Sequence, residues 1–264
     1  MNFNVINARY TIMPVESLTD YDRRRYNRQM LIRDFGEHGQ EKLKNARIFI
    51  AGCGGLGSPI ATYLAVAGFG TLVIADMDIV DLSNLNRQIL HWDRNVGEDK
   101  VKSAYNKLIQ INPSIRIEPF NGRIDENNVL ELTKGCDLIL DAMDNFETRY
   151  LLNQASLYHK IPFIHGSIWG MEGRITTLIP GQTPCLKCIF PKAPPKEVFP
   201  VLGATAGVIG TLQVTEAVKV LLGLGETLAG RLLVYDGEYM EFHEIKIERN
   251  PDCPDCGPKN LPVI

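Results

Sequence analysis

The feature that most constrains the fold is a short apolar run that ends in a cluster of glycines. Residues 47–51 read Arg-Ile-Phe-Ile-Ala and are followed at once by Gly-Cys-Gly-Gly-Leu-Gly at 52–57. A continuous apolar run of this length predicts a strand buried on both faces, as in a parallel sheet. The sequence of residues 58–67 then predicts a helix, with Pro59 in its first turn. The core therefore begins with a strand, a glycine turn and a helix.

The same alternation continues along the chain. Residues 21–45 are polar and predict a helical segment. Further apolar runs and helical spacings predict strands at 71–75, 116–119, 136–140 and 162–164 and helices at 100–111, 125–133 and 146–159. Strands that alternate with helices indicate an α/β fold, a Rossmann-like, mostly parallel sheet with helices on both faces and right-handed crossovers.

The pattern changes after Gly170. Here we expect a strand at 174–179, a helix at 205–222 and a late antiparallel pair at 231–235 and 242–247. We interpret residues 1–20 as an N-terminal extension. Residues 21–264 are then a single domain whose C-terminal elaboration follows the parallel part of the sheet.

Composition excludes several classes of protein. The chain has 264 residues, with 45% hydrophobic and 22% charged, which is ordinary for a globular domain. Its 28 basic and 31 acidic residues give a net charge of −3, so we expect no nucleic-acid or membrane partner. The long uncharged stretches 48–75 and 198–215 are broken by glycine and proline, which argues against membrane spans. With no signal-peptide core at its start, we expect a cytoplasmic protein.

The glycine turn suits a nucleotide. Gly52, Gly54 and Gly57 match Gly-x-Gly-x-x-Gly, and Gly55 adds a further small residue. Such a turn lets the backbone approach a phosphate at a helix N-terminus. Asp76 follows the next predicted strand, where a carboxylate can hold a ribose hydroxyl. The alternative is a turn that needs glycine only for packing.

The segment after Asp76 is rich in polar groups that suit phosphate. A hydride-transfer enzyme needs an apolar slot for nicotinamide here, whereas this chain places carboxamides and an arginine beside the turn. Lys100 opens the next helix as a second cation. The alternative is a solvated loop. The candidate residues are Asp78, Ser83, Asn84, Asn86, Arg87 and Gln88.

A third candidate position follows the strand at 136–140. Asp144 and Asn145 stand at its carboxyl end, where ligands bind in open α/β sheets. A carboxylate there can hold Mg²⁺ that is shared with nucleotide phosphates. Either residue can instead cap the following helix. The histidines show no ligand spacing, and His165 at a strand end is the hardest of them to dismiss.

Four of the six cysteines form two Cys-x-x-Cys pairs. Two such pairs can supply four thiolates to a structural Zn²⁺ that ties the C-terminus to the body of the protein, and a redox dithiol is the rival explanation. The predicted zinc ligands are Cys185, Cys188, Cys253 and Cys256. Cys53 and Cys136 remain, the first in the glycine turn and the second in a predicted strand.

Together these motifs resemble the ubiquitin-activating-enzyme-like adenylyltransferases of the ThiF/MoeB/HesA family, over about residues 21–257. Each motif alone is modest, and their shared order makes the resemblance specific. It is carried by Arg-Tyr-Asn-Arg-Gln at 25–29, the glycine turn at 52–57, Asp-Met-Asp at 76–78, Ser-Asn-Leu-Asn-Arg-Gln at 83–88, Val-Gly-Glu-Asp-Lys at 96–100, Asp144-Asn145 and both Cys-x-x-Cys pairs.

The resemblance implies a reaction and a set of roles. Such enzymes use ATP and Mg²⁺ to adenylate the C-terminal carboxylate of a small ubiquitin-like protein that ends in Gly-Gly. Gly55 would then lie against the phosphates, Asp76 would hold the ribose, and Asp144 would bind Mg²⁺. Asn86, Arg87 and Lys100 would contact phosphate. Arg28 would reach the phosphates bound to a neighbouring subunit, which implies a homodimer.

Other functions stay open at this point. The acyl substrate is a sulfur carrier for molybdopterin, thiamine or tRNA thiolation, or else the carboxylate of a peptide or small molecule. An NAD-dependent oxidoreductase is the alternative from a different class. Many relatives carry a cysteine in the loop after the first Cys-x-x-Cys pair, yet this chain has none between Cys188 and Cys253. We therefore expect its reaction to end at the acyl-adenylate.

Overall fold

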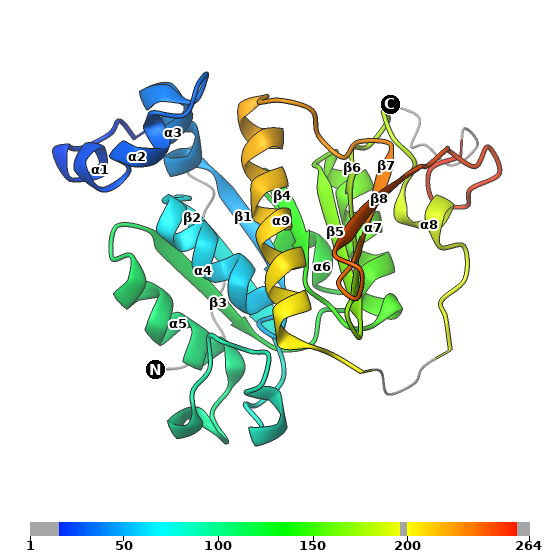
Figure 1. The fold of residues 1–264 in the computed structure, drawn as a ribbon, viewed down its shortest axis with the longest axis horizontal. Helices are drawn as coiled ribbons and strands as arrows, with labels where there is room; N and C mark the ends of the chain where they lie inside the picture. Colours follow the sequence, from blue (N-terminus) through cyan, green and yellow to red (C-terminus); the bar gives the residue numbers. More distant parts are fainter. Residues whose placement is uncertain (1–15, 196–199, 258–264) are drawn as a thin grey trace.

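The computed structural model describes residues 16–195 and 200–257. Its centre is an eight-stranded sheet in the order β3-β2-β1-β4-β5-β6-β7-β8 (Figure 1). The first five strands in sequence run parallel, and the last three pair antiparallel at one edge, which confirms the predicted fold class. The strands are β1 (Arg47–Ala51), β2 (Thr71–Asp76), β3 (Arg116–Asn121), β4 (Leu138–Asp141), β5 (Phe163–Trp169), β6 (Glu172–Leu178), β7 (Arg231–Asp236) and β8 (Glu241–Lys246).

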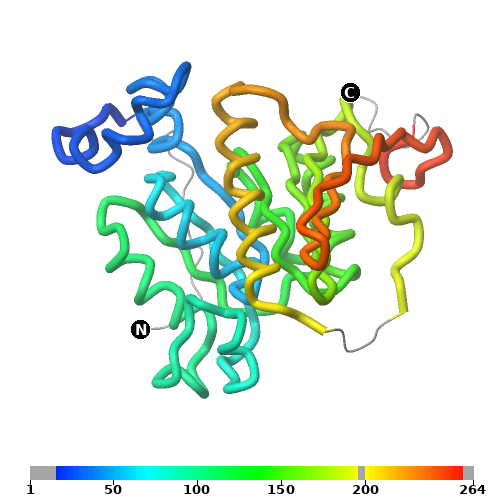
Figure 2. The backbone as a smooth tube through the Cα atoms, viewed as in Figure 1, coloured from blue at the N-terminus to red at the C-terminus, as the bar shows by residue number. Residues whose placement is uncertain are grey.

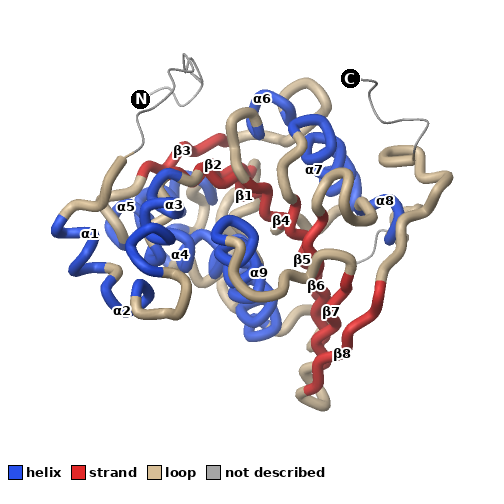
Figure 3. Tube along the Cα trace, turned by 90° about the horizontal axis from the view of Figure 1, so that it is seen from above, coloured by secondary structure: helices blue, strands red, loops and turns tan. Residues whose placement is uncertain are grey.

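Helices cover both faces of the sheet (Figure 3). Ile48 and Ile50 of β1 belong to a core cluster with α4, α5 and α9, whereas Phe49 belongs to the cluster with α6 and α7. Because alternate side chains point to opposite faces, a strand covered on both sides must be apolar throughout. The helices are α1 (Asp20–Arg25), α2 (Asn27–Met30), α3 (Gly36–Asn45), α4 (Gly57–Ala67), α5 (Lys100–Ile111), α6 (Val129–Thr133), α7 (Phe146–His159), α8 (Leu186–Ile189) and α9 (Gly203–Leu222).

Several predicted boundaries are wrong for local reasons. Residues 21–45 form three helices, since Tyr26 leaves helical geometry and Asp34 and Gly36 adopt positive φ values of 66° and 58°. The helix predicted at 125–133 starts at Val129, because Asp125 accepts a hydrogen bond from the Asn127 N–H and forms a turn.

Other boundaries differ because strand pairing overrides the sequence pattern. The strand predicted at 136–140 begins at Leu138, where pairing with β1 begins. The strand predicted at 162–164 extends to Trp169, since β5 pairs with β6 along its whole length. The short helix α8 between Cys185 and Phe190 was not predicted.

α9 is the one helix among the described residues with the length and composition to cross a membrane, with 44% of its most apolar window buried. It lies along the sheet and contacts α4, β5 and β6. A Cβ on Gly173 of β6 would stand only 2.2 Å from Ile209, so the helix packs directly on the strand backbone. Its apolar surface therefore serves the core of the fold.

The connectivity positions a ligand site between β1 and β4. The chain moves outward from β1 to β2 and β3, and then returns to β4 on the other side of β1. Loops that leave neighbouring strands in opposite directions open a crevice at the carboxyl ends of those strands. The glycine turn follows β1, and Asp144 and Asn145 follow β4, so the candidate residues meet at this point.

Candidate functional site

The four glycines of the turn fall into two kinds. A Cβ on Gly57 would lie 2.0 Å from the carbonyl oxygen of Gly52, and one on Gly52, which has φ of 101°, would lie 2.7 Å from the Ala142 oxygen. These two positions allow no side chain. Gly54 and Gly55 are different, because a Cβ there meets nothing nearer than 3.5 and 3.6 Å. Gly52 and Gly57 close the turn, and Gly54 and Gly55 form its open surface.

Cys53 is held from both sides. Its N–H donates to Asp76 Oδ2 at 2.7 Å, and its carbonyl oxygen lies 2.9 Å from His91 Nε2. Within residues 16–195 and 200–257, the next two N–H groups, of Gly54 and Gly55, have no hydrogen-bond acceptor. Free donors beside the start of α4 are suited to an anion such as phosphate.

Asp76, the last residue of β2, lies beside the glycine turn. Its carboxylate accepts hydrogen bonds from the N–H groups of Cys53 and Asp78, at 2.7 and 2.9 Å. Burial raises the pKa of this carboxyl, and the charge of Lys100 and the two hydrogen bonds oppose that shift. Each carboxylate oxygen keeps a further lone pair with which it can accept a hydroxyl.

The loop after β2 folds back over the turn. The Arg87 guanidinium donates to the Ser83 carbonyl and to Asn86 Oδ1, both at 2.9 Å, and the Arg87 stem packs 3.6 Å from the Cβ position of Gly55. Gln88 is buried, with its amide 3.5 Å from the Cβ position of Gly54. The structure thus brings Arg87 and Gln88 to the turn, whereas Asn84 is half-buried and Ser83 and Asn86 are exposed in the loop before them.

Lys100 is the buried cation of the site. It begins α5, and its Nζ lies 2.9 Å from Asp78 Oδ2. The lysine side chain is 7% exposed and that of Asp78 is 56% exposed. The ion pair leaves the ammonium two further donors near the glycine turn.

Two carboxylates follow β4, and they differ in environment. Asp141 is fully buried: one oxygen accepts the Met143 N–H at 2.9 Å, and the other lies 2.6 Å from His165 Nδ1 and 3.2 Å from Arg149 Nε. Arg149 also donates to the Met143 carbonyl at 2.5 Å. Burial lowers the pKa of His165, and the hydrogen bond and charge of Asp141 oppose that shift.

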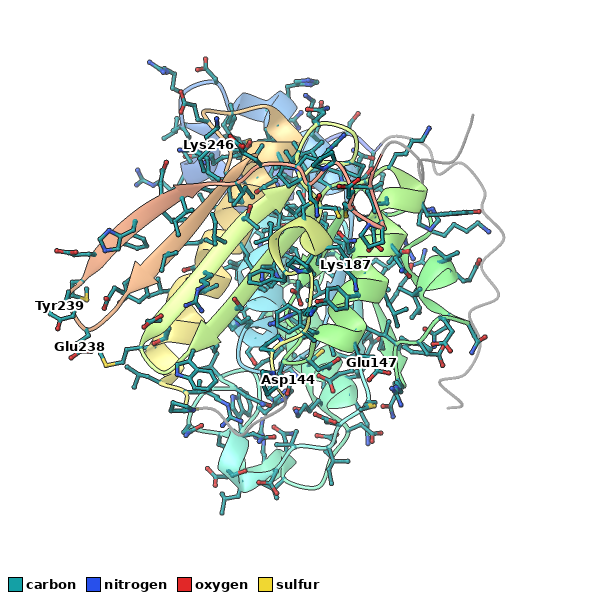
Figure 4. All side chains as sticks on the ribbon, turned by 90° about the vertical axis from the view of Figure 1, so that its right-hand side faces the viewer. Asp144, Glu147, Lys187, Glu238, Tyr239 and Lys246 are labelled. Carbon is teal, nitrogen blue, oxygen red and sulfur yellow. The ribbon has the colours of Figure 1, made fainter. Side chains whose placement is uncertain are left out.

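Asp144 is exposed, with only the Asn145 amide at 3.4 Å from its carboxylate among the described residues (Figure 4). Asn145 caps α7 by accepting the Thr148 N–H at 2.9 Å. Asn145 is therefore the helix cap, and the adjacent Asp144 carboxylate is not used for capping. A carboxylate oxygen at the carboxyl end of β4, beside the glycine turn, fits Mg²⁺, which prefers oxygen ligands and retains waters.

Arg28 is the predicted site residue that the fold keeps apart from the others. It is exposed on α2, and the neighbouring Gln29 donates to the Ala67 carbonyl at the end of α4. The end of α4 leads into the start of β2, so Arg28 lies near the amino ends of the strands, opposite the glycine turn (Figure 1).

The two Cys-x-x-Cys pairs meet at the C-terminal end of the described chain. The red stretch beside α8 in Figure 2 brings Cys253 to 3.6 Å from Cys185 and Cys256 to 3.4 Å from Cys188, sulfur to sulfur. All four sulfurs lie within 4.8 Å of one another. Tetrahedral zinc with bonds of about 2.3 Å needs sulfurs about 3.8 Å apart, so the cluster fits a four-thiolate metal site.

Known proteins with this combination of features identify the family. A profile of the ThiF family matches residues 26–255. The chain belongs to the ThiF family. It is 45% identical to "SAMP-activating enzyme E1" of Haloferax volcanii over 88% of each chain. It is 42% identical to "Sulfur carrier protein adenylyltransferase" of Thermus thermophilus, over 88% of this chain and 90% of that protein.

Two further comparisons describe length and fold. This ThiF-family chain is 42% identical to "Adenylyltransferase and sulfurtransferase MOCS3" of Drosophila persimilis over 94% of its own length, but it spans only 56% of that protein. The crystal structure of E. coli MccB with ATP shares its fold, with a TM-score of 0.79 and 24% identity over 88% of this chain and 73% of that one.

Sequence reasoning missed the buried residues of this ThiF-family site. Arg149 and His91 carried no recognisable spacing, although each binds the backbone beside a predicted ligand-binding residue. The start of α9 was also missed: a Cβ on Gly203 would lie 2.4 Å from the Asn86 carbonyl oxygen. A glycine at the start of a long apolar helix was the available signal.

The cysteine cluster generates a prediction for metal content. We expect one Zn²⁺ per chain, and Cys256→Ser should lose it and lower the melting temperature by about 5 °C or more, because the metal closes a long loop. Asp252→Ala, an exposed neighbour, is the control and should retain both metal and stability. Elemental analysis and thermal melts measure this, and metal-free protein purified without chelator would contradict it.

Proposed function

We propose that this protein uses ATP and Mg²⁺ to adenylate the C-terminal carboxylate of a small ubiquitin-like sulfur-carrier protein that ends in Gly-Gly. The observation that carries the proposal is the meeting of free N–H donors, two cations and an exposed carboxylate where β1 and β4 end. The relatives, which include a sulfur carrier protein adenylyltransferase and a SAMP-activating enzyme, support ATP chemistry on a sulfur carrier rather than NAD-dependent oxidation. We place the reaction in the cytoplasm, in molybdopterin, thiamine or tRNA thiolation chemistry.

ATP would lie along the turn with its ribose toward β2. The N–H groups of Gly54 and Gly55 would bind phosphate oxygens, and Asp76 would accept the ribose hydroxyls. Arg87 and Lys100 would balance the phosphate charge, since both stand beside the turn. The full set proposed for the nucleotide is Gly52, Gly54, Gly55, Gly57, Asp76, Asp78, Ser83, Asn84, Asn86, Arg87, Gln88, Lys100, Asp144 and Asn145.

The reaction needs positioning and charge balance rather than a strong base. An oxygen of the carrier's ionised carboxylate attacks the α-phosphorus, the bond from that phosphorus to the bridging oxygen breaks, and pyrophosphate leaves with the electron pair. The carboxylate has no proton to lose. Arg87, Lys100 and the turn N–H groups therefore contribute by aligning the phosphates and by stabilising charge on their oxygens.

Asp144 would hold Mg²⁺ against the phosphates. Bound there, the ion supplies positive charge that screens the phosphate oxygens from the incoming carboxylate. The protein's own contribution is to fix the carboxylate: Asp141 and Arg149 hold the N–H and the carbonyl of Met143, the residue before Asp144. These contacts lie in a buried cluster that contains the Arg149–Asp141 ion pair, and they fix the backbone just before Asp144.

Asp144→Ala should lower carrier-dependent ATP–pyrophosphate exchange by at least about a hundredfold, because the metal loses its protein ligand. Glu147→Ala is the matched control, since Glu147 is exposed one turn further along and pairs only with Arg123 among the described residues. Its exchange rate should stay near wild type. Wild-type exchange in Asp144→Ala would refute the role of this carboxylate.

The position of Arg28 favours a homodimer with shared sites. α2, which carries Arg28, lies at the end of the sheet opposite the glycine turn (Figure 1), so we assign Arg28 to the phosphates of a neighbouring subunit. Elements near it carry exposed apolar side chains, which suit contact with a second copy of the chain. They are Tyr21 in α1, Leu31 and Ile32 after α2, and Tyr63 and Val66 in α4.

Mixing Arg28→Ala subunits with Asp144→Ala subunits should restore activity that neither variant has alone. One of the two sites in such a heterodimer receives an intact Arg28 and an intact Asp144. The measurement is pyrophosphate release after co-expression and isolation of differently tagged heterodimers. Isolated heterodimers without activity would contradict a site shared between subunits.

The available thiols support a reaction that ends at the acyl-adenylate. Cys53 is 1% exposed, and burial raises the pKa of its thiol well above the ordinary range. Burial also raises the pKa of Cys136 to about 12. A covalent nucleophile needs exposure and a lowered pKa, and neither thiol has them. The remaining four cysteines are the proposed zinc ligands.

After reaction with ATP and carrier, non-reducing gels and intact mass should show no reductant-sensitive adduct between enzyme and carrier. Cys53→Ala should form acyl-adenylate at close to the wild-type rate. An adduct that reductant cleaves and that Cys53→Ala lacks would show that Cys53 is a nucleophile and would overturn this prediction.

A further inference from the structure

We infer that His91 is a positioning residue for phosphate binding, which acts through the carbonyl of Cys53. The inference rests on the proposed function for its meaning, because it assumes that ATP lies on the glycine turn. It concerns a side chain that faces away from the ligand. His91 is 3% exposed and lies three residues after Gln88, behind the turn.

The hydrogen bonds around His91 have a single consistent direction. A carbonyl oxygen only accepts, so the contact of 2.9 Å to the Cys53 oxygen puts the proton on Nε2. Nδ1 then accepts from the Ser103 hydroxyl, also at 2.9 Å. Ser103 in turn accepts from the Lys107 ammonium at 2.7 Å. A chain of donors therefore runs from Lys107 on α5 to the glycine turn.

The surroundings keep the imidazole neutral. Burial lowers the pKa of His91 to about 4, and the nearby charges of Lys107 and Lys100 act in the same direction. Lys107 is itself anchored, since it donates to Asn95 Oδ1 at 2.6 Å and its ammonium lies 4.6 Å from the centre of the Trp92 ring. Each ring nitrogen of His91 thus has a fixed partner: the Cys53 carbonyl at Nε2 and the Ser103 hydroxyl at Nδ1.

The planarity of the peptide bond carries this effect to the ligand. The Cys53 carbonyl and the Gly54 N–H belong to one trans peptide unit, so they point in opposite directions. When His91 holds the carbonyl behind the turn, the Gly54 N–H must face forward. Asp76 holds the preceding N–H, of Cys53 itself. The two contacts, with a longer one of 3.5 Å from the Ser58 hydroxyl to the same Cys53 carbonyl, fix the peptide units on both sides of Cys53 before any phosphate arrives.

A purely structural role for His91 and a positioning role predict different ATP affinities in variants of this residue. If His91 only fills the core, any variant that preserves folding should preserve ATP affinity. If it orients the Gly54 N–H, affinity should follow the presence of a donor at the Nε2 position. Glutamine can place its amide nitrogen near that position, whereas the shorter asparagine reaches only the Nδ1 position. The two variants are alike in chemistry and differ in reach.

The experiment is calorimetric binding of ATP and Mg²⁺ to the full-length protein without carrier, with thermal melts of each variant. His91→Asn should weaken ATP binding about tenfold, the value of one well-placed hydrogen bond, and His91→Gln should stay within about threefold of wild type. Ser103→Ala leaves the Nε2 donor in place and should also stay within about threefold.

Equal ATP affinity in His91→Asn and wild type would overturn the inference. So would an equal loss in His91→Gln and His91→Asn when both melt at similar temperatures. Because no carrier is present, failure of the carrier proposal leaves these outcomes unchanged. Failure of wild-type protein to bind ATP would instead refute the proposed function, and the inference with it.

Discussion

The site depends on one close contact between the ends of the glycine turn. The carbonyl of Gly52 lies where a side chain of Gly57 would have to be, so β1 passes into α4 with no space for a methyl group. This contact directs the start of α4 across the carboxyl end of β1. The half-buried Gly54 and Gly55, and the loop that packs on them, take their positions from it.

Two buried contact pairs then fix the backbone on either side of the crevice. At the end of β1, Asp76 and His91 hold the N–H and the carbonyl of Cys53. At the end of β4, Asp141 and Arg149 hold the same two groups of Met143. In each case the next residue points toward the proposed ligand. Buried hydrogen bonds to backbone groups hold those groups in place before the substrate binds.

The sequence predicted those elements whose pattern reflects burial or local backbone chemistry. β1, α5 and α7 were correct to the residue, because apolar periodicity and the Asn145 cap are local signals. The glycine turn was predictable for the same reason. His91 and Arg149 were not, because their partners are backbone groups brought near only by the tertiary fold. The distance of Arg28 from the turn also needed the sheet order, which no local pattern contains.

The most direct test of the account is the fate of the nucleotide when the protein meets ATP, Mg²⁺ and a ubiquitin-like carrier ending in Gly-Gly. Intact mass spectrometry should show one AMP on the carrier and release of pyrophosphate. A carrier with an amidated C-terminus should gain none. Unmodified carrier with ADP and phosphate as products, or AMP on the amidated carrier, would contradict attack by the C-terminal carboxylate on the α-phosphorus.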